Sequence, residues 1–186
     1  MKDSIEKSIL DSAECIKKAT NLSEMVEKAI KEIINCLERG NKIIIFGNGG
    51  SAADAQHMAA EFIGRFQKER QSFPAISLTT DSSIITAIGN DYNFNKIFSR
   101  QAESLVKNGD IIIAISTSGN SGNIINGIKT SKKLGAKIIS LTGKNGFKMK
   151  SISDIFLNVP SITTPRIQEA HRTIIHIICE LVENKL

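Results

Sequence analysis

From about residue 40 onward, short apolar segments alternate with segments of helical periodicity. Five apolar segments predict β-strands at residues 42–46, 75–79, 110–115, 137–141 and 154–159. The loops after these strands lead into predicted helices, including one at residues 52–66, a short one after residue 83 and one ending near residue 134. Strands that are apolar on both faces and alternate with helices are typical of a parallel sheet covered on both sides. The pattern therefore predicts an α/β fold.

The first forty residues have a different pattern. Apolar residues recur at spacings of three and four from Leu22 to Leu37, and Gly40 ends the pattern. A weaker apolar stripe runs from residue 5 to residue 16. We therefore expect one domain of 186 residues, in which residues 1–40 form a helical arm and residues 41–186 form the α/β core. The arm would contact another subunit or pack on its own domain.

The last predicted helix spans residues 166–183. Its apolar residues cover most of the helix circumference rather than a single stripe. A helix of this kind is normally buried. We expect it to lie between subunits.

The composition excludes several classes of protein. No apolar run approaches the roughly 20 residues that a membrane helix needs, and the first twenty residues carry eight charges that are incompatible with a secretory signal. The three cysteines lie far apart in helical segments, which predicts free thiols and a cytoplasmic protein. The net charge of +5 is scattered, and one Tyr with no Trp offers little for bases to stack on. We expect no nucleic-acid or membrane partner, and a weak positive field would suit a small anionic substrate.

The loop after the third predicted strand has four hydroxyl side chains in six residues, Ser116, Thr117, Ser118 and Ser121. It precedes a predicted helix, whose first N–H groups and dipole favour an anion. The combination predicts a phosphate site. The alternative is an ordinary turn in which Ser121 caps the helix.

The loop after the first predicted strand, residues 47–52, fits the pattern G-x-G-x-x-A of dinucleotide-binding proteins. The acidic residue expected about 20 positions later is absent, and no nucleotide P-loop motif occurs. We expect no nucleotide cofactor. The side chain of Asn48 and the backbone of this loop are instead suited to sugar hydroxyls.

Two helices carry all three histidines. His57 and Glu61 are one turn apart on one face of the helix after the glycine-rich loop, a spacing that suits metal binding or proton transfer. Gln168, His171 and His176 lie on the last predicted helix. The alternative is that the histidines are structural and that Glu61 is solvated.

Several motifs together resemble the bacterial phosphoheptose isomerases of the sugar isomerase (SIS) domain superfamily. They are GNGGSAADAQH at 47–57, AAEF at 59–62, GRF at 64–66, STSGNS at 116–121 and RIQE at 166–169. The resemblance covers nearly the whole chain. It implies a doubly wound α/β domain with a five-stranded parallel sheet, and a cytoplasmic homotetramer with sites between subunits. It implies conversion of sedoheptulose 7-phosphate to D-glycero-D-manno-heptose 7-phosphate through an enediol, the first step of heptose synthesis for lipopolysaccharide or capsule.

The resemblance also implies residue roles. One Zn²⁺ per subunit would be held by His57, Glu61, Gln168 and His176, and the reaction would need no redox cofactor. Substrate would be bound by Asn48, Gly49, Gly50, Glu61, Asn90, Asp91, Ser116, Thr117, Ser118, Ser121 and Gln168. Glu61 would be the catalytic base and His176 the acid/base partner, since their ordinary pKa values suit these tasks. His171 matches no role.

Two alternatives stay open. Non-catalytic SIS proteins that associate with the replication initiator share the fold, and we expect them to lack the carboxylate at Glu61 and the imidazole at His176. This chain has both. The other alternative is an isomerase of a different phosphosugar.

Overall fold

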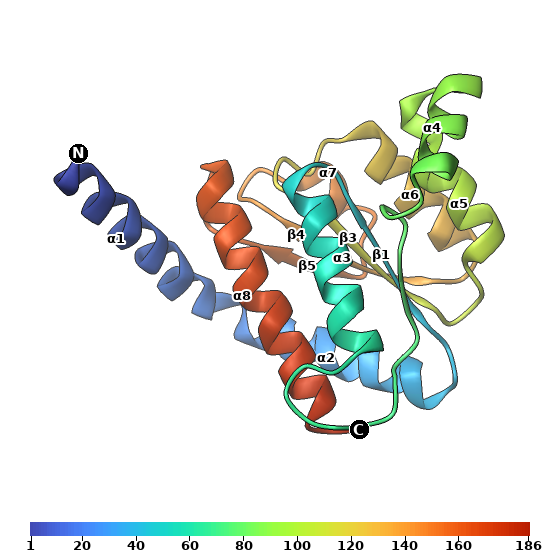
Figure 1. The fold of residues 1–186 in the computed structure, drawn as a ribbon, viewed down its shortest axis with the longest axis horizontal. Helices are drawn as coiled ribbons and strands as arrows, with labels where there is room; N and C mark the ends of the chain where they lie inside the picture. Colours follow the sequence, from blue (N-terminus) through green and yellow to red (C-terminus); the bar gives the residue numbers. More distant parts are fainter.

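The computed structural model describes residues 1–186 and contains one five-stranded parallel sheet (Figure 1). The strands are β1 (Ile43–Gly47), β2 (Ala75–Ser77), β3 (Ile111–Ser116), β4 (Lys137–Thr142) and β5 (Ile155–Asn158). Their order is β2-β1-β3-β4-β5, and all neighbouring pairs are parallel. The predicted α/β fold and its five strands are therefore confirmed. The connection from β1 leads to β2 on one side of the sheet, and the connection from β3 leads to β4 on the other side. A topological switch point therefore lies between β1 and β3.

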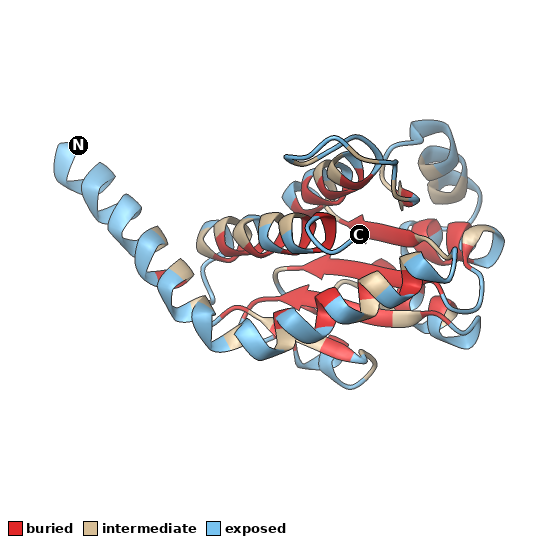
Figure 2. Cartoon of the chain, turned by 90° about the horizontal axis from the view of Figure 1, so that it is seen from below, coloured by how far each residue is buried: buried red, intermediate tan, exposed pale blue.

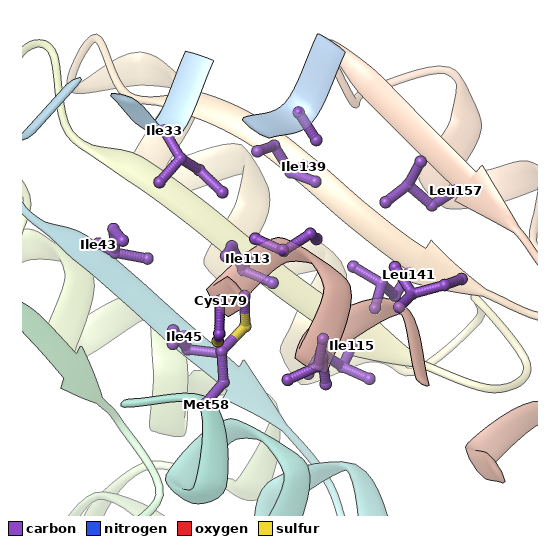
Figure 3. Packing of buried hydrophobic residues seen from close by; sticks show 14 of the residues in the cluster. Ile33, Ile43, Ile45, Met58, Ile113, Ile115, Ile139, Leu141, Leu157 and Cys179 are labelled. Carbon is purple, nitrogen blue, oxygen red and sulfur yellow. The ribbon is translucent and has the colours of Figure 1, made fainter. Parts of the chain in front are cut away.

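Helices cover both faces of the sheet (Figure 1). The helices are α1 (Lys2–Lys18), α2 (Ser23–Glu38), α3 (Gly50–Ile63), α4 (Ser82–Asp91), α5 (Ile97–Leu105), α6 (Gly122–Lys133), α7 (Phe147–Lys150) and α8 (Thr164–Glu183). Two 3-10 turns, η1 (Ala19–Leu22) and η2 (Phe94–Lys96), complete the chain. Because side chains alternate along a strand, Ile43 and Ile45 face a core shared with α2, α3 and α8, whereas Ile44 and Phe46 face a core shared with α5 and α6. Figure 3 shows part of the first core, where Ile113 of β3 lies near Cys179 of α8.

Three helical segments differ from the predictions. The helix predicted at residues 52–66 begins at Gly50 and ends at Ile63, because the backbone beyond Gly64 turns away and Phe66 bonds to Glu183. Helices α5 and α7 were not predicted. They are short, and α7 spans a single turn in a lysine-rich segment.

The N-terminal helix α1 projects from the body of the protein (Figure 2). Cys15 is its only buried residue, while Ile5 and Ile9 are 55% and 63% exposed. Helix α8 buries one broad face, but Ile177 and Leu181 are exposed in the single chain. The single chain buries one side of α8, and burial of the other side between subunits stays a prediction.

The three cysteines are free and buried, as predicted. Burial raises the pKa of the Cys36 thiol to about 11 and that of Cys179 to about 12, so both stay protonated at neutral pH. No helix is both long and apolar enough to cross a bilayer.

Candidate active site

The loops that leave β1 and β3 meet at the switch point of the sheet. Gly47 at the end of β1 pairs in register with Ile115 of β3, so the glycine-rich loop and the hydroxyl-rich loop start side by side. In open parallel sheets, ligands bind outside the carboxyl ends of the strands at such a point. The fold therefore brings the two predicted binding loops to one crevice.

The glycine-rich loop needs its glycines for two different reasons. Gly49 has a φ of +55°, which strains any residue with a side chain. Gly50 lies against the side-chain amide of Gln168, and a Cβ at this position would collide with that amide. The absence of a side chain at Gly50 thus allows Gln168 of α8 to reach the start of α3.

The hydroxyl-rich loop is arranged with open donors at the start of α6. The Ser121 hydroxyl makes no capping bond to the helix and lies 3.5 Å from the Ser116 hydroxyl. The backbone N–H groups of Gly122 and Asn123 have no acceptor within the chain. This geometry disfavours the ordinary capped turn, and the open N–H groups beside several hydroxyls suit an anion.

A pair of asparagines joins the two loops. The amide Nδ2 of Asn48 donates to Oδ1 of Asn123 at 3.0 Å, and Nδ2 of Asn123 donates to Oδ1 of Asn48 at 2.8 Å. Asn48 is a predicted site residue, whereas Asn123 lies 75 residues away and has no local signal in the sequence.

His57, Glu61 and His176 come together where α3 packs on α8. The Nε2 atom of His57 lies 2.9 Å from Oε1 of Glu61, and both side chains are partly exposed. The His176 ring meets the His57 ring edge to face, with 5.1 Å between centroids, and the Phe66 ring lies 5.6 Å from His176 on another side. A carboxylate and two imidazoles that remain accessible to solvent form a constellation suited to proton transfer.

The other two polar residues of α8 have different surroundings. Gln168 lines a polar cavity of about 290 Å³ together with Gly50, Asp54 and Arg172, and Arg172 forms a 2.7 Å ion pair with Asp54. His171 is completely buried, and neither ring nitrogen has a hydrogen-bond partner with good geometry. Burial lowers the pKa of His171 to about 4, although the Thr142 carbonyl and Asp54 partly oppose this shift. His171 is therefore a neutral core residue, whereas His176 is available for chemistry.

Three of the four predicted ligands, two imidazoles and a carboxylate, are donor types that zinc prefers. The structure brings His57, Glu61 and His176 together, but Gln168 contacts the glycine-rich loop. No three His, Cys, Asp or Glu side chains are grouped closely enough in this conformation to hold a metal ion. Two imidazoles and a carboxylate fit zinc, and the metal site stays a prediction because this conformation does not assemble it.

Asn90 and Asp91 lie at the end of α4, which buries no residue. Asn90 donates to Asp91 at 3.0 Å, and neither side chain is hydrogen-bonded to another predicted site residue. The single chain therefore leaves both residues exposed to solvent and does not link them to the crevice.

A hydrogen-bond cluster with no signal in the sequence lies between the loop after α3 and the end of α8. The carboxylate of Glu183 accepts the backbone N–H groups of Phe66, Gln67 and Lys68 at 2.8–2.9 Å, and Nε of Arg70 at 3.0 Å. These bonds lower the pKa of Glu183 to about 2 despite its burial. The cluster ties the loop after α3 to the end of α8, and thereby holds Phe66 beside His176.

The fold and the crevice define a SIS domain, and residues 9–143 match the SIS domain family. Two solved phosphoheptose isomerases have the same fold. That of Neisseria gonorrhoeae is 40% identical with a TM-score of 0.93 and 98% of each chain covered, and that of Francisella tularensis is 36% identical with a TM-score of 0.94 and 98% and 97% covered. The phosphoheptose isomerase of Aliarcobacter butzleri is 52% identical over 187 residues, which cover 100% of this chain and 99% of that protein. The Helicobacter pylori enzyme is 50% identical over 182 residues, which cover 97% and 95%. The chain belongs to the phosphoheptose isomerase family.

Proposed function

We propose that this enzyme converts sedoheptulose 7-phosphate to D-glycero-D-manno-heptose 7-phosphate. The observations that carry the proposal are the accessible group of Glu61, His57 and His176 and, separately, the open anion donors at the start of α6, in a chain of this family. The product would enter the cytoplasmic synthesis of activated heptose for lipopolysaccharide or capsule.

The reaction moves a carbonyl from C2 to C1 without net oxidation. Glu61 removes a proton from C1, which leaves an enediol, and the proton returns to C2. His176 exchanges protons with the two oxygens, because an imidazole can both donate and accept near neutral pH. The contact of His57 with Glu61 orients the carboxylate for this task.

The phosphate of the substrate is held by Ser116, Thr117, Ser118 and Ser121. Support comes from the open N–H groups at the start of α6 and from the Ser121 hydroxyl, which makes no capping bond to the helix. The sugar lies along Asn48, Gly49 and Gly50. Gln168 reaches the same loop from α8.

Zinc is part of this proposal, with His57, Glu61, Gln168 and His176 as ligands. A divalent ion bound there would polarise the substrate carbonyl and stabilise negative charge on its oxygen. The support is the adjacency of His57, Glu61 and His176 and the match of donor types.

We further propose a homotetramer in which neighbouring subunits complete each site. A groove of about 500 Å³ between α1, α2 and α8 is lined by Ile16, Val26, Ile30, Ile174 and Ile177, among other residues. Large exposed apolar surfaces of this kind mark interaction sites between proteins. Asn90 and Asp91 would reach the substrate bound to a neighbour.

The test follows the sugar carbons by NMR after mixing purified protein with sedoheptulose 7-phosphate, once with added Zn²⁺ and once with chelator. We expect an aldoheptose phosphate to appear with Zn²⁺ and turnover to fall in chelator. Glu61→Gln should abolish conversion, while Glu69→Gln should not, because Glu69 is 91% exposed and only loosely paired to Arg65. Wild-type turnover by Glu61→Gln would exclude Glu61 as the base. No conversion by folded wild-type protein would refute the proposed reaction.

A further inference from the structure

The reciprocal bond between Asn48 and Asn123 spans the switch point of the sheet. Asn48 follows β1, and Asn123 is the second residue of α6 after β3. The pair therefore joins two parts of the proposed site, the loop that holds the sugar and the start of α6 that holds the phosphate. Ligands of open parallel sheets bind at this switch point.

The two amides are fixed very differently. Asn123 is only 2% exposed, and its Oδ1 accepts a second bond, from the N–H of Ile124 at 2.9 Å. Its orientation is thus set by its own helix. Asn48 is half-buried and has no side-chain hydrogen bond other than those to Asn123. Asn48 keeps one N–H and one lone pair for a ligand.

We propose that Asn123 is a positioning residue that acts through Asn48. It fixes the side chain of Asn48 before substrate arrives, so that the free N–H and lone pair of Asn48 need no reorganisation on binding. The side chain of Asn123 does not contact the substrate in this proposal. This inference rests on the proposed function, because it assigns Asn48 to the sugar.

A double-mutant cycle tests the inference. Asn48→Ala, Asn123→Ala and the double variant are compared with wild type in kcat/KM for sedoheptulose 7-phosphate and, in chelator, in the Kd of the same sugar phosphate. Without Asn123 the side chain of Asn48 is free to rotate, so Asn123→Ala should lower kcat/KM about tenfold or more. The double variant should be no worse than Asn48→Ala within about twofold, because Asn123 has nothing left to position.

Two further variants separate positioning from packing. Asn123→Leu fills the space but makes no hydrogen bond, so it should be as impaired as Asn123→Ala. Asn126→Ala is the matched control on α6, because Asn126 is exposed and its amide bonds only to the Asn95 carbonyl. It should keep wild-type kcat/KM. Circular dichroism identifies any variant that does not fold, and Asn123→Leu then replaces Asn123→Ala in the cycle.

The outcomes are distinct. If the loss of kcat/KM in the double variant equals the product of the two single losses, the inference is overturned and the proposed reaction stays intact. Recovery of activity in Asn123→Leu would do the same, since it would show a packing role. A wild-type protein that neither converts nor binds the sugar phosphate would overturn the proposed reaction and this inference with it.

Discussion

Replacing Glu183 by Gln should remove about 3 kcal/mol of stability. The Glu183 side chain is 2% exposed and accepts hydrogen bonds from the backbone N–H groups of Phe66, Gln67 and Lys68 and from Arg70. These bonds lower the pKa of Glu183 from 4.5 to about 2, and about 2.5 pKa units correspond to about 3 kcal/mol. Breaking one side of a buried ion pair costs a similar amount, about 3–5 kcal/mol. A Gln would also direct its NH₂ group at backbone donors.

The sign of the pH dependence follows from the lowered pKa. Because the folded pKa lies below the unfolded value, the Glu183 contribution is complete above about pH 4.5 and is lost as the pH falls toward 2. The difference between wild type and Glu183→Gln should therefore shrink over that range. Urea unfolding followed by circular dichroism measures this difference, at one protein concentration because association would add to stability.

Glu180→Gln is the matched control. Glu180 lies one turn earlier on α8, is half-buried and has no ion pair or side-chain hydrogen bond, so its replacement should change stability by less than about 0.5 kcal/mol. A loss below about 1 kcal/mol in Glu183→Gln would refute the reasoning. It would show that the bonds of Glu183 to the loop are replaced by water at little cost.

The pKa of buried His171 is lowered from 6.5 to about 4, so the unfolded chain binds a proton at a higher pH than the folded chain does. The free energy of unfolding should therefore fall by about 3 kcal/mol as the pH drops from 6.5 to 4. The urea midpoint of His171→Leu should not show this dependence on pH. The double variant Ser118→Ala and Ser121→Ala should raise KM more than it lowers kcat, because phosphate contacts are largely uniform binding, and an unchanged KM in steady-state kinetics would place the phosphate elsewhere. Replacing the exposed Ile5 and Ile9 by Asp should reduce the mass measured by light scattering without unfolding the domain, whereas an unchanged mass would exclude this stripe from the interface.

The sequence predicts those parts of the fold that depend on local patterns. The strands were found because their β-branched runs are continuous, as in β1 and β3, and α2 was found because its apolar stripe is long. Helix α5 is not evident in the sequence because it is only nine residues long and two of its five buried residues, Ser99 and Gln101, are polar. The spacing of His57 and Glu61 predicted their contact, since a helix fixes neighbours four residues apart.

Long-range partners were beyond local patterns. His171 and His176 are similar in sequence context, and only the packing of α8 on the sheet shows that the first is sealed in the core. Asn123 bonds to a residue 75 positions away, and Glu183 bonds to backbone groups more than 110 positions away. A backbone N–H has no signature in sequence, so the role of Glu183 needed the structure.

Burial divides the site into a part that one chain completes and a part that it does not. The crevice between β1 and β3 is built on strands and helices with buried faces, and its loops are joined by Asn48 and Asn123. Helix α4, in contrast, buries no residue, although it carries two residues assigned to the substrate. A ten-residue helix gains little stability from its own hydrogen bonds and needs packing to persist. In the proposed tetramer a neighbour would supply that packing, so association would stabilise α4 and bring Asn90 and Asp91 to the substrate in the same step.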